Sequence, residues 1–176
     1  MVLNIIPDNH ADLFPYVLIV MTAICLECFL TSFIQGSKRK VFTKIMEKFK
    51  DQHLQDFNKK PAAIGHPDCG YGRYSDELTY KEWFDYNNAQ RVHLNFVEQL
   101  PIMMVLIYLA ALKQPLAALI LSCTYFACRL AYAISYIGGG PNLRIVATAP
   151  SFGIKWTLYG LSFYTVSCYL DQYPKN

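Results

Sequence analysis

Apolar residues gather into four stretches along the chain, each about as long as a membrane-spanning helix. They cover about residues 13–35, 92–112, 116–137 and 152–170. An α-helix needs roughly 20 apolar residues to cross the hydrocarbon core of a bilayer. Because lipid offers no hydrogen-bond partners, backbone groups in such a stretch must pair within it, which favours helices. The pattern therefore predicts an all-α, integral membrane four-helix bundle. The first stretch lacks a basic segment before it, so we expect a retained span rather than a cleaved signal peptide.

A polar segment of about residues 41–88 separates the first two stretches. The first part of this segment has an amphipathic pattern. Apolar residues recur every three or four positions on one helical face, and charged residues lie on the opposite face. The apolar set is Val41, Phe42, Ile45, Met46 and Phe49, and the charged set is Lys44, Glu47, Lys48 and Lys50. This pattern predicts a basic amphipathic helix over 41–57, lying on the cytoplasmic membrane surface or against a partner protein. Residues 58–80 are rich in Pro and Gly and predict an irregular connection, followed by a polar approach to the second span.

Composition and charge support this topology. Hydrophobic residues make up 53% of the chain and charged residues 16%, whereas a soluble domain carries about 25% charged residues. The 176 residues fit one domain, 1–176. Basic residues crowd the segment after the first span, which places that segment and the loop near Arg144 on the cytoplasmic side. The net charge of +3 indicates lipid attraction rather than nucleic-acid binding. Five of six cysteines lie within spans, and neither a disulfide framework nor a metal site is expected.

Two predicted spans carry polar residues on one helical face. In the second, Arg91, Asn95 and Glu98 are spaced i, i+4, i+7. In the third, Arg129, Tyr132 and Tyr136 are spaced i, i+3, i+7, and Arg144 follows in the next loop. Charges inside spans are costly, so each needs a reason. Glu27 in the first span is expected to pair with another helix.

The chemistry of these residues leaves two interpretations open. Arginines can bind carboxylates through paired donors, Glu98 can accept from an ammonium group and Asn95 can bond an amide. That set suits a peptide-like anion with carboxylates and an amine, and Arg144 could stabilise a thiolate. Alternatively, the polar residues pair with one another as structural contacts between helices, and Arg91 reaches water from its helix end.

These residues resemble the motifs of the MAPEG family, the membrane-associated proteins in eicosanoid and glutathione metabolism. The first motif is R-x-x-x-N-x-x-E followed by proline, matched by Arg91, Asn95, Glu98 and Pro101. The second comprises Arg129-Leu130-Ala131-Tyr132, then Tyr136, a Gly-rich bend and Asn142-Leu143-Arg144. The R-V-H-x-N sequence is most similar to microsomal glutathione transferases of the third type. Three differences stand out. Gln99 occupies a position where several members carry an aromatic residue, the 41–88 insertion is far longer than usual, and Ile145 follows Arg144 where some members carry a serine.

The resemblance implies a homotrimer of four-helix bundles, with glutathione as co-substrate bound between subunits near the cytosolic face. It assigns the stabilisation of the glutathione thiolate to Arg144. The residues that it implies for binding glutathione are Arg39 (or Lys38), Arg91, His93, Asn95, Glu98, Tyr132 and Tyr136. The implied function is a glutathione transferase or peroxidase acting on lipophilic electrophiles or lipid hydroperoxides, in the endoplasmic reticulum or a mitochondrial membrane. Two alternatives are a non-catalytic structural subunit of a larger membrane complex, such as a mitochondrial one, and a lipid-presenting protein.

Overall fold

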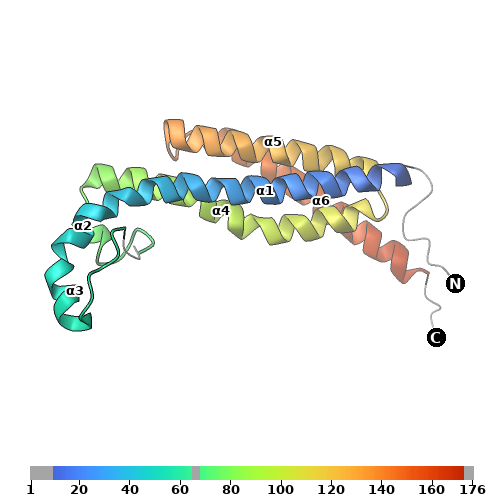
Figure 1. Ribbon diagram of the computed structural model, residues 1–176. Coiled ribbons are helices and arrows are strands. Elements are labelled where there is room, and N and C mark those ends of the chain that lie inside the picture. The colour runs from blue at the N-terminus through green and yellow to red at the C-terminus, as the bar shows by residue number, and fades with distance from the viewer. Residues whose placement is uncertain (1–9, 65–67, 173–176) are drawn as a thin grey trace. The chain divides into compact units, whose positions relative to one another are not determined.

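The computed structural model describes residues 10–64 and 68–172, and within these ranges every regular element is a helix. Four helices are long (Figure 1). The rest are two short helices, α2 (Thr43–Lys48) and α3 (Lys50–Phe57), and three 3-10 turns, η1 (Ala11–Leu13), η2 (Arg39–Phe42) and η3 (Ser75–Glu77). The long helices are α1 (Phe14–Lys38), α4 (Tyr80–Ala111), α5 (Pro115–Gly139) and α6 (Ile145–Leu170). The predicted fold class is confirmed. The N-terminal residues 1–9, on which the prediction of a retained span partly rests, lie outside the described ranges.

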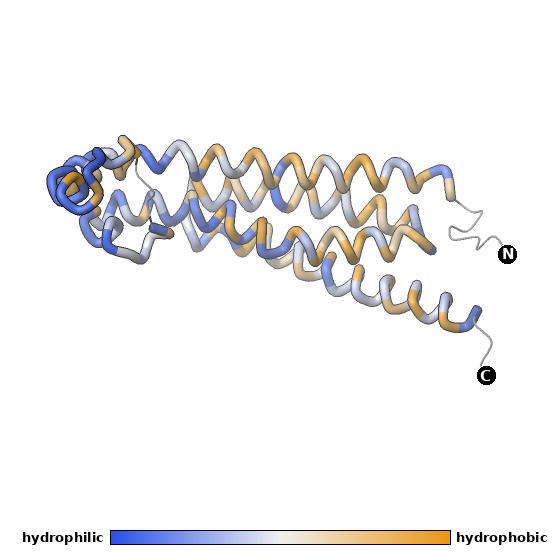
Figure 2. The backbone as a smooth tube through the Cα atoms, turned by 60° about the horizontal axis from the view of Figure 1, so that its bottom comes forward, coloured by the Kyte–Doolittle hydropathy of each residue, from blue (hydrophilic) through white to orange (hydrophobic). Residues whose placement is uncertain are grey.

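Three helical stretches are long and apolar enough to cross a membrane: Ala11–Lys48, Tyr80–Ala111 and Pro115–Gly139. Figure 2 shows the long helices largely in hydrophobic colours, whereas the segment around α2 and α3 is largely hydrophilic. The helix predicted for the fourth span is present as α6 and begins at Ile145, seven positions before residue 152. Its apolar residues are interrupted by Lys155 and by several Gly, Ser and Thr residues, and its crossing of the membrane stays a prediction.

The chain divides into two compact units, and the first comprises Met1–Phe29 and Phe96–Asn176. Its described part is a four-helix bundle with one continuous core. Val17 and Ile24 of α1, Ile107 of α4 and Leu158 of α6 are fully buried in it, together with Tyr125 of α5. Large apolar side chains also point outward: Ile19, Trp156 and Phe163 are 62%, 72% and 73% exposed. An apolar exterior around a packed interior is what a bundle in lipid requires.

The second unit, Leu30–Asn95, contains the insertion. The predicted helix over 41–57 is present but breaks at Phe49 into α2 (Thr43–Lys48) and α3 (Lys50–Phe57). Part of its apolar face packs within this unit, and its predicted place on a membrane surface or against a partner protein stays a prediction. Phe42 and Ile45 are fully buried against Tyr86 of α4, and the rings of Phe42 and Tyr86 meet edge to face at 4.9 Å. The amphipathic pattern thus marks the small core of the insertion itself.

The polar approach predicted for residues 76–88 is mostly helix, because α4 begins at Tyr80. Thr79 and Glu82 form a capping box: the Glu82 carboxylate accepts from the Thr79 amide at 3.1 Å, and the Glu82 amide donates to Thr79 Oγ1 at 3.4 Å. The spacing T-x-x-E in the sequence signals this start. At 1.5 Å per residue the 32-residue helix is about 48 Å long, well beyond a hydrocarbon core of roughly 30 Å. We therefore expect its polar first turns to extend outside the membrane.

Asp68 organises the connection between α3 and α4. Its carboxylate accepts hydrogen bonds from the amides of Gly70, Tyr74 and Ser75 at 3.0, 2.9 and 3.0 Å, and from the Ser75 hydroxyl. Burial alone would raise the pKa of Asp68, but these hydrogen bonds outweigh burial and lower it below its ordinary value. The ionised carboxylate thus holds the turn formed by residues 68–75.

The lowered pKa of Asp68 makes the stability of this turn depend on pH. A carboxyl group with a depressed folded pKa stabilises the fold above its unfolded pKa of about 3.9, and this contribution is lost as pH falls through the folded value. Asp68→Asn should therefore weaken amide protection in the 68–75 turn at pH 7, and the difference from wild type should shrink below about pH 4. Hydrogen exchange of peptides from this segment measures the difference. An equal effect at pH 3 and pH 7 would contradict the assignment.

Candidate functional site

Four of the predicted glutathione-binding residues lie in the unit formed by Leu30–Asn95. Arg91 is exposed on α4, and Asn95 is half-buried one turn later on the same face. His93 points in another direction: its Nδ1 lies 2.9 Å from the hydroxyl of Thr31, which is buried on α1. This hydrogen bond fixes the imidazole between two helices, so His93 has a structural contact, and its role in binding glutathione stays a prediction.

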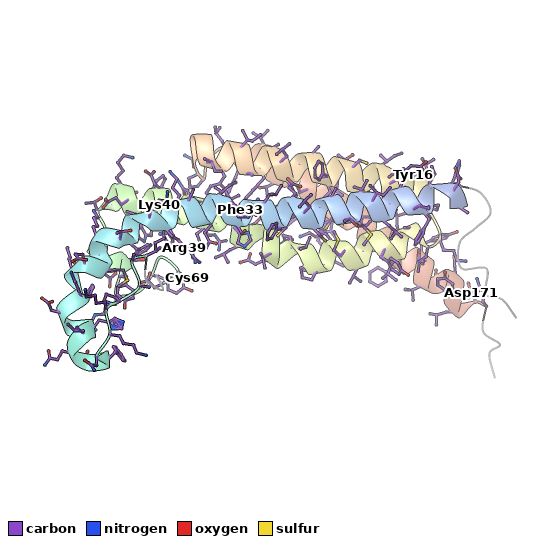
Figure 3. All side chains as sticks on the ribbon, viewed as in Figure 1. Tyr16, Phe33, Arg39, Lys40, Cys69 and Asp171 are labelled. Atoms are coloured by element: carbon purple, nitrogen blue, oxygen red, sulfur yellow. The ribbon has the colours of Figure 1, made fainter. Side chains whose placement is uncertain are left out.

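Arg39 follows α1 directly, at the start of η2, and is labelled in Figure 3. Its guanidinium interacts with the hydroxyl of Tyr86 on α4. Its Nε atom is buried and has no hydrogen-bond partner among the residues that the structure describes. A buried donor without a partner is costly, and a bound anion at this position would satisfy it. Lys38, the other candidate, is an exposed residue that ends α1.

The remaining predicted residues lie in the bundle unit. Glu98 is exposed on α4, and Tyr132 and Tyr136 lie one turn apart on α5 with ring centroids 5.5 Å apart. Both tyrosines are buried. Arg144 is the last residue of the turn after α5, and its carbonyl accepts the first amide bonds of α6, from Ala147 at 3.1 Å and Thr148 at 2.9 Å. Its side chain is exposed, at the position where α6 begins.

Each group of predicted residues therefore lies on regular helices or at a helix end, with the spacing along each helix that the sequence indicates. Arg91 and Asn95 share a face of α4, and Tyr132 and Tyr136 share a face of α5. The convergence of the two groups on one hollow stays a prediction.

Arg129 has a larger structural role than its spacing suggests. It is 5% exposed, and its guanidinium carbon lies 4.2 Å from the ring centroid of Phe96 and 4.7 Å from that of Tyr132. Both contacts have the geometry of cation–π interactions. Glu27 of α1 lies within electrostatic range of Arg129, and its pairing with another helix stays a prediction. Both carboxylate oxygens of Glu27 are buried and lack a hydrogen-bond partner within the described ranges.

A contact that the sequence did not reveal joins α4 to α6. Lys155 donates a hydrogen bond from Nζ to the side-chain carbonyl of Gln99. This contact gives a reason for an amide at position 99, because the ammonium group needs an acceptor inside the bundle. In the described parts of the chain, Lys155 forms no ion pair with a carboxylate. A lysine within the predicted fourth span was the signal that could have drawn attention to it.

Comparison with known proteins identifies the family of the chain. A search of curated proteins found no match to the chain. The sequence model of the MAPEG family matches residues 13–164, well over half of the 176 residues. The match spans all four long helices as far as Tyr164 and includes every predicted site residue. The chain therefore belongs to the MAPEG family, whose members are generally glutathione-dependent membrane enzymes.

Proposed function

We propose that this chain is a membrane glutathione transferase or peroxidase of the third microsomal type. The observation that carries the proposal is the family match over residues 13–164, together with two helical faces that keep the family's polar motifs. The acceptor is a lipophilic electrophile or a lipid hydroperoxide that enters from the bilayer. The protein works as a homotrimer in the endoplasmic reticulum or a mitochondrial membrane, with glutathione bound between subunits from the cytosolic side.

The proposed roles follow from the chemistry of each side chain. Arg91 and Arg39 bind the carboxylates of glutathione, and Glu98 accepts from its ammonium group. Asn95, His93 and the two tyrosines complete the polar lining. Arg144 stabilises the thiolate that forms when the thiol loses its proton. In this scheme the enzyme contributes proximity and an ionised nucleophile.

Two reactions are open to the bound thiolate. In conjugation, the sulfur forms a bond to an electrophilic carbon, and the electron pair leaves with the displaced group or moves into the acceptor. In peroxide reduction, the thiolate sulfur attacks the terminal oxygen of the hydroperoxide, and the O–O bond breaks. The lipid alkoxide that remains takes up a proton and becomes an alcohol. A second glutathione then releases water from the oxidised sulfur and forms glutathione disulfide, so two thiols supply the two electrons.

A single assay tests the proposal. Purified protein in lipid nanodiscs is mixed with glutathione and either an aryl chloride or cumene hydroperoxide, and product is followed by mass spectrometry. We expect turnover above the uncatalysed rate, which is lost in Asn95→Ala and kept in Lys81→Ala, a change of an exposed residue. No turnover with either acceptor would contradict the proposed enzyme.

One observation favours a second candidate, a structural subunit of a larger membrane complex. The insertion belongs to a compact unit, Leu30–Asn95, with a core of Phe42, Ile45 and Tyr86, which glutathione chemistry does not require. This alternative predicts stable co-purification with other chains at fixed stoichiometry and no turnover. A homotrimer by native mass spectrometry, with turnover, supports the enzyme instead.

A further inference from the structure

The connection between α3 and α4 is attached to α4 by three hydrogen bonds along one helical face. Side chains at positions i, i+3 and i+7 of the helix donate to three consecutive backbone carbonyls of the connection, among them that of Cys69 (labelled in Figure 3). The bonds run from Trp83 Nε1 to Gly70 at 2.7 Å, from the Tyr86 hydroxyl to Asp68 at 3.2 Å, and from Gln90 Nε2 to Cys69 at 2.7 Å. We call these six residues the insertion clamp.

Glycine at position 70 makes the close approach possible. Gly70 is buried and has a φ of +87°, which side chains other than glycine rarely adopt. A Cβ atom there would lie 2.7 Å from Nδ2 of Asn87 on α4 and closer still to its Oδ1. The backbone of the connection therefore lies directly against the helix. The Asp68 carboxylate holds this backbone in shape through its bonds to Gly70, Tyr74 and Ser75.

The last side chain of the insertion clamp is next to the first glutathione motif. Gln90 is 2% exposed and directly precedes Arg91. Three residues after Gln90, His93 is bonded to Thr31 of α1 at 2.9 Å. Since each residue turns an α-helix by about 100°, fixing Gln90 and His93 also fixes the directions of Arg91 and Asn95.

The position of the motif on α4 shows why such support is needed. Arg91 lies only 11 positions after the first helical residue, Tyr80. Helix ends fray, because their first amides lack partners within the helix, and short helical segments are marginal in water. Without tertiary contacts, fraying of the turns that extend outside the membrane would reach the motif.

We propose that the insertion clamp positions the glutathione-binding face of α4, with Gln90 and Asp68 as positioning residues. This inference rests on the proposed function. The insertion then acts on the affinity for glutathione, whereas the acceptor site and the chemical step are untouched. A clamp that merely covers the helix would leave the kinetics of glutathione unchanged.

The variants Gln90→Met and Asp68→Ala test the proposal in the full-length protein. Gln90→Met keeps the side-chain length and removes the amide, and Asp68→Ala releases the turn. We expect faster hydrogen exchange over residues 80–95. We also expect the KM for glutathione to rise about ten-fold, which corresponds to the loss of roughly one charged hydrogen bond between glutathione and α4. The kcat at saturating glutathione and the KM for the acceptor should stay within two-fold. Asp68→Asn, which keeps an acceptor oxygen, should recover part of the affinity.

Lys81→Met is the matched control, because Lys81 lies in the same turns of α4 but is 85% exposed and bonds only to Asp85 among the described residues. It should leave both exchange and KM unchanged. If wild type turns over glutathione and the two clamp variants keep its KM within two-fold, or keep exchange unchanged, the positioning role is wrong while the proposed function stands. If wild type neither binds nor turns over glutathione, both are wrong.

Discussion

Arg144→Ala is expected to lower kcat by about 100-fold or more while the affinity for glutathione stays nearly unchanged. Removing one donor that stabilises a developing anion typically costs about 10²–10³ in rate. Arg144 is exposed at the beginning of α6, where its backbone rather than its side chain caps the helix. The substitution should therefore disturb the chemistry and leave the bundle intact.

The pH profile separates this role from simple binding. An unassisted thiol has a pKa of about 8.5, so Arg144→Ala should regain activity as the pH approaches 9, whereas the wild type reaches its plateau at lower pH. Arg144→Lys keeps the positive charge and should retain more activity than alanine. A raised KM for glutathione with unchanged kcat would instead place Arg144 in binding and contradict the assignment.

Arg129→Met is expected to give the largest loss of stability, about 3 kcal/mol or more, because it removes one member of a buried charge cluster. The guanidinium contacts two aromatic rings, Phe96 and Tyr132, and attracts the carboxylate of Glu27. Methionine fills much of the same volume, so the loss reports the charge rather than a cavity. Unfolding of the protein in detergent, followed by circular dichroism, measures the change.

Two further variants make the Arg129 prediction specific. Glu27→Gln combined with Arg129→Met should be more stable than Arg129→Met alone, because no carboxylate is then left without its cation. Lys113→Met removes another cation–π contact, with Tyr169 at 4.7 Å, from the turn between α4 and α5, and should cost about 1 kcal/mol or less. A double variant no more stable than the single one would show that Glu27 and Arg129 are not coupled.

Much of the bundle was predictable because helix length and apolar content are local properties. The four apolar stretches correspond to α1, α4, α5 and α6. The glycine run of residues 138–140 is an equally local signal for the end of the third helix: α5 stops at Gly139, and Gly140 has a φ of 71°. The capping box at Thr79 was equally local, and it would have placed the start of α4 correctly.

The insertion was not predictable to the same degree, because its apolar face has a partner far along the chain. Phe42 and Tyr86 are 44 positions apart in sequence, and periodicity alone cannot tell a lipid surface from such a contact. The same limit applies to the site. Spacing placed Arg91 with Asn95 and Tyr132 with Tyr136, but Gln99 with Lys155 and His93 with Thr31 depend on how separate helices pack.

Calorimetric titration of glutathione into the purified protein in nanodiscs tests the central claim most directly. The proposed enzyme predicts saturable binding to the wild type, and its loss in Arg91→Ala and Asn95→Ala, which change residues on one face of α4. Lys81→Ala should bind like the wild type. Absence of saturable heat with folded wild-type protein, or equal binding by all four proteins, would contradict a glutathione site built on that face.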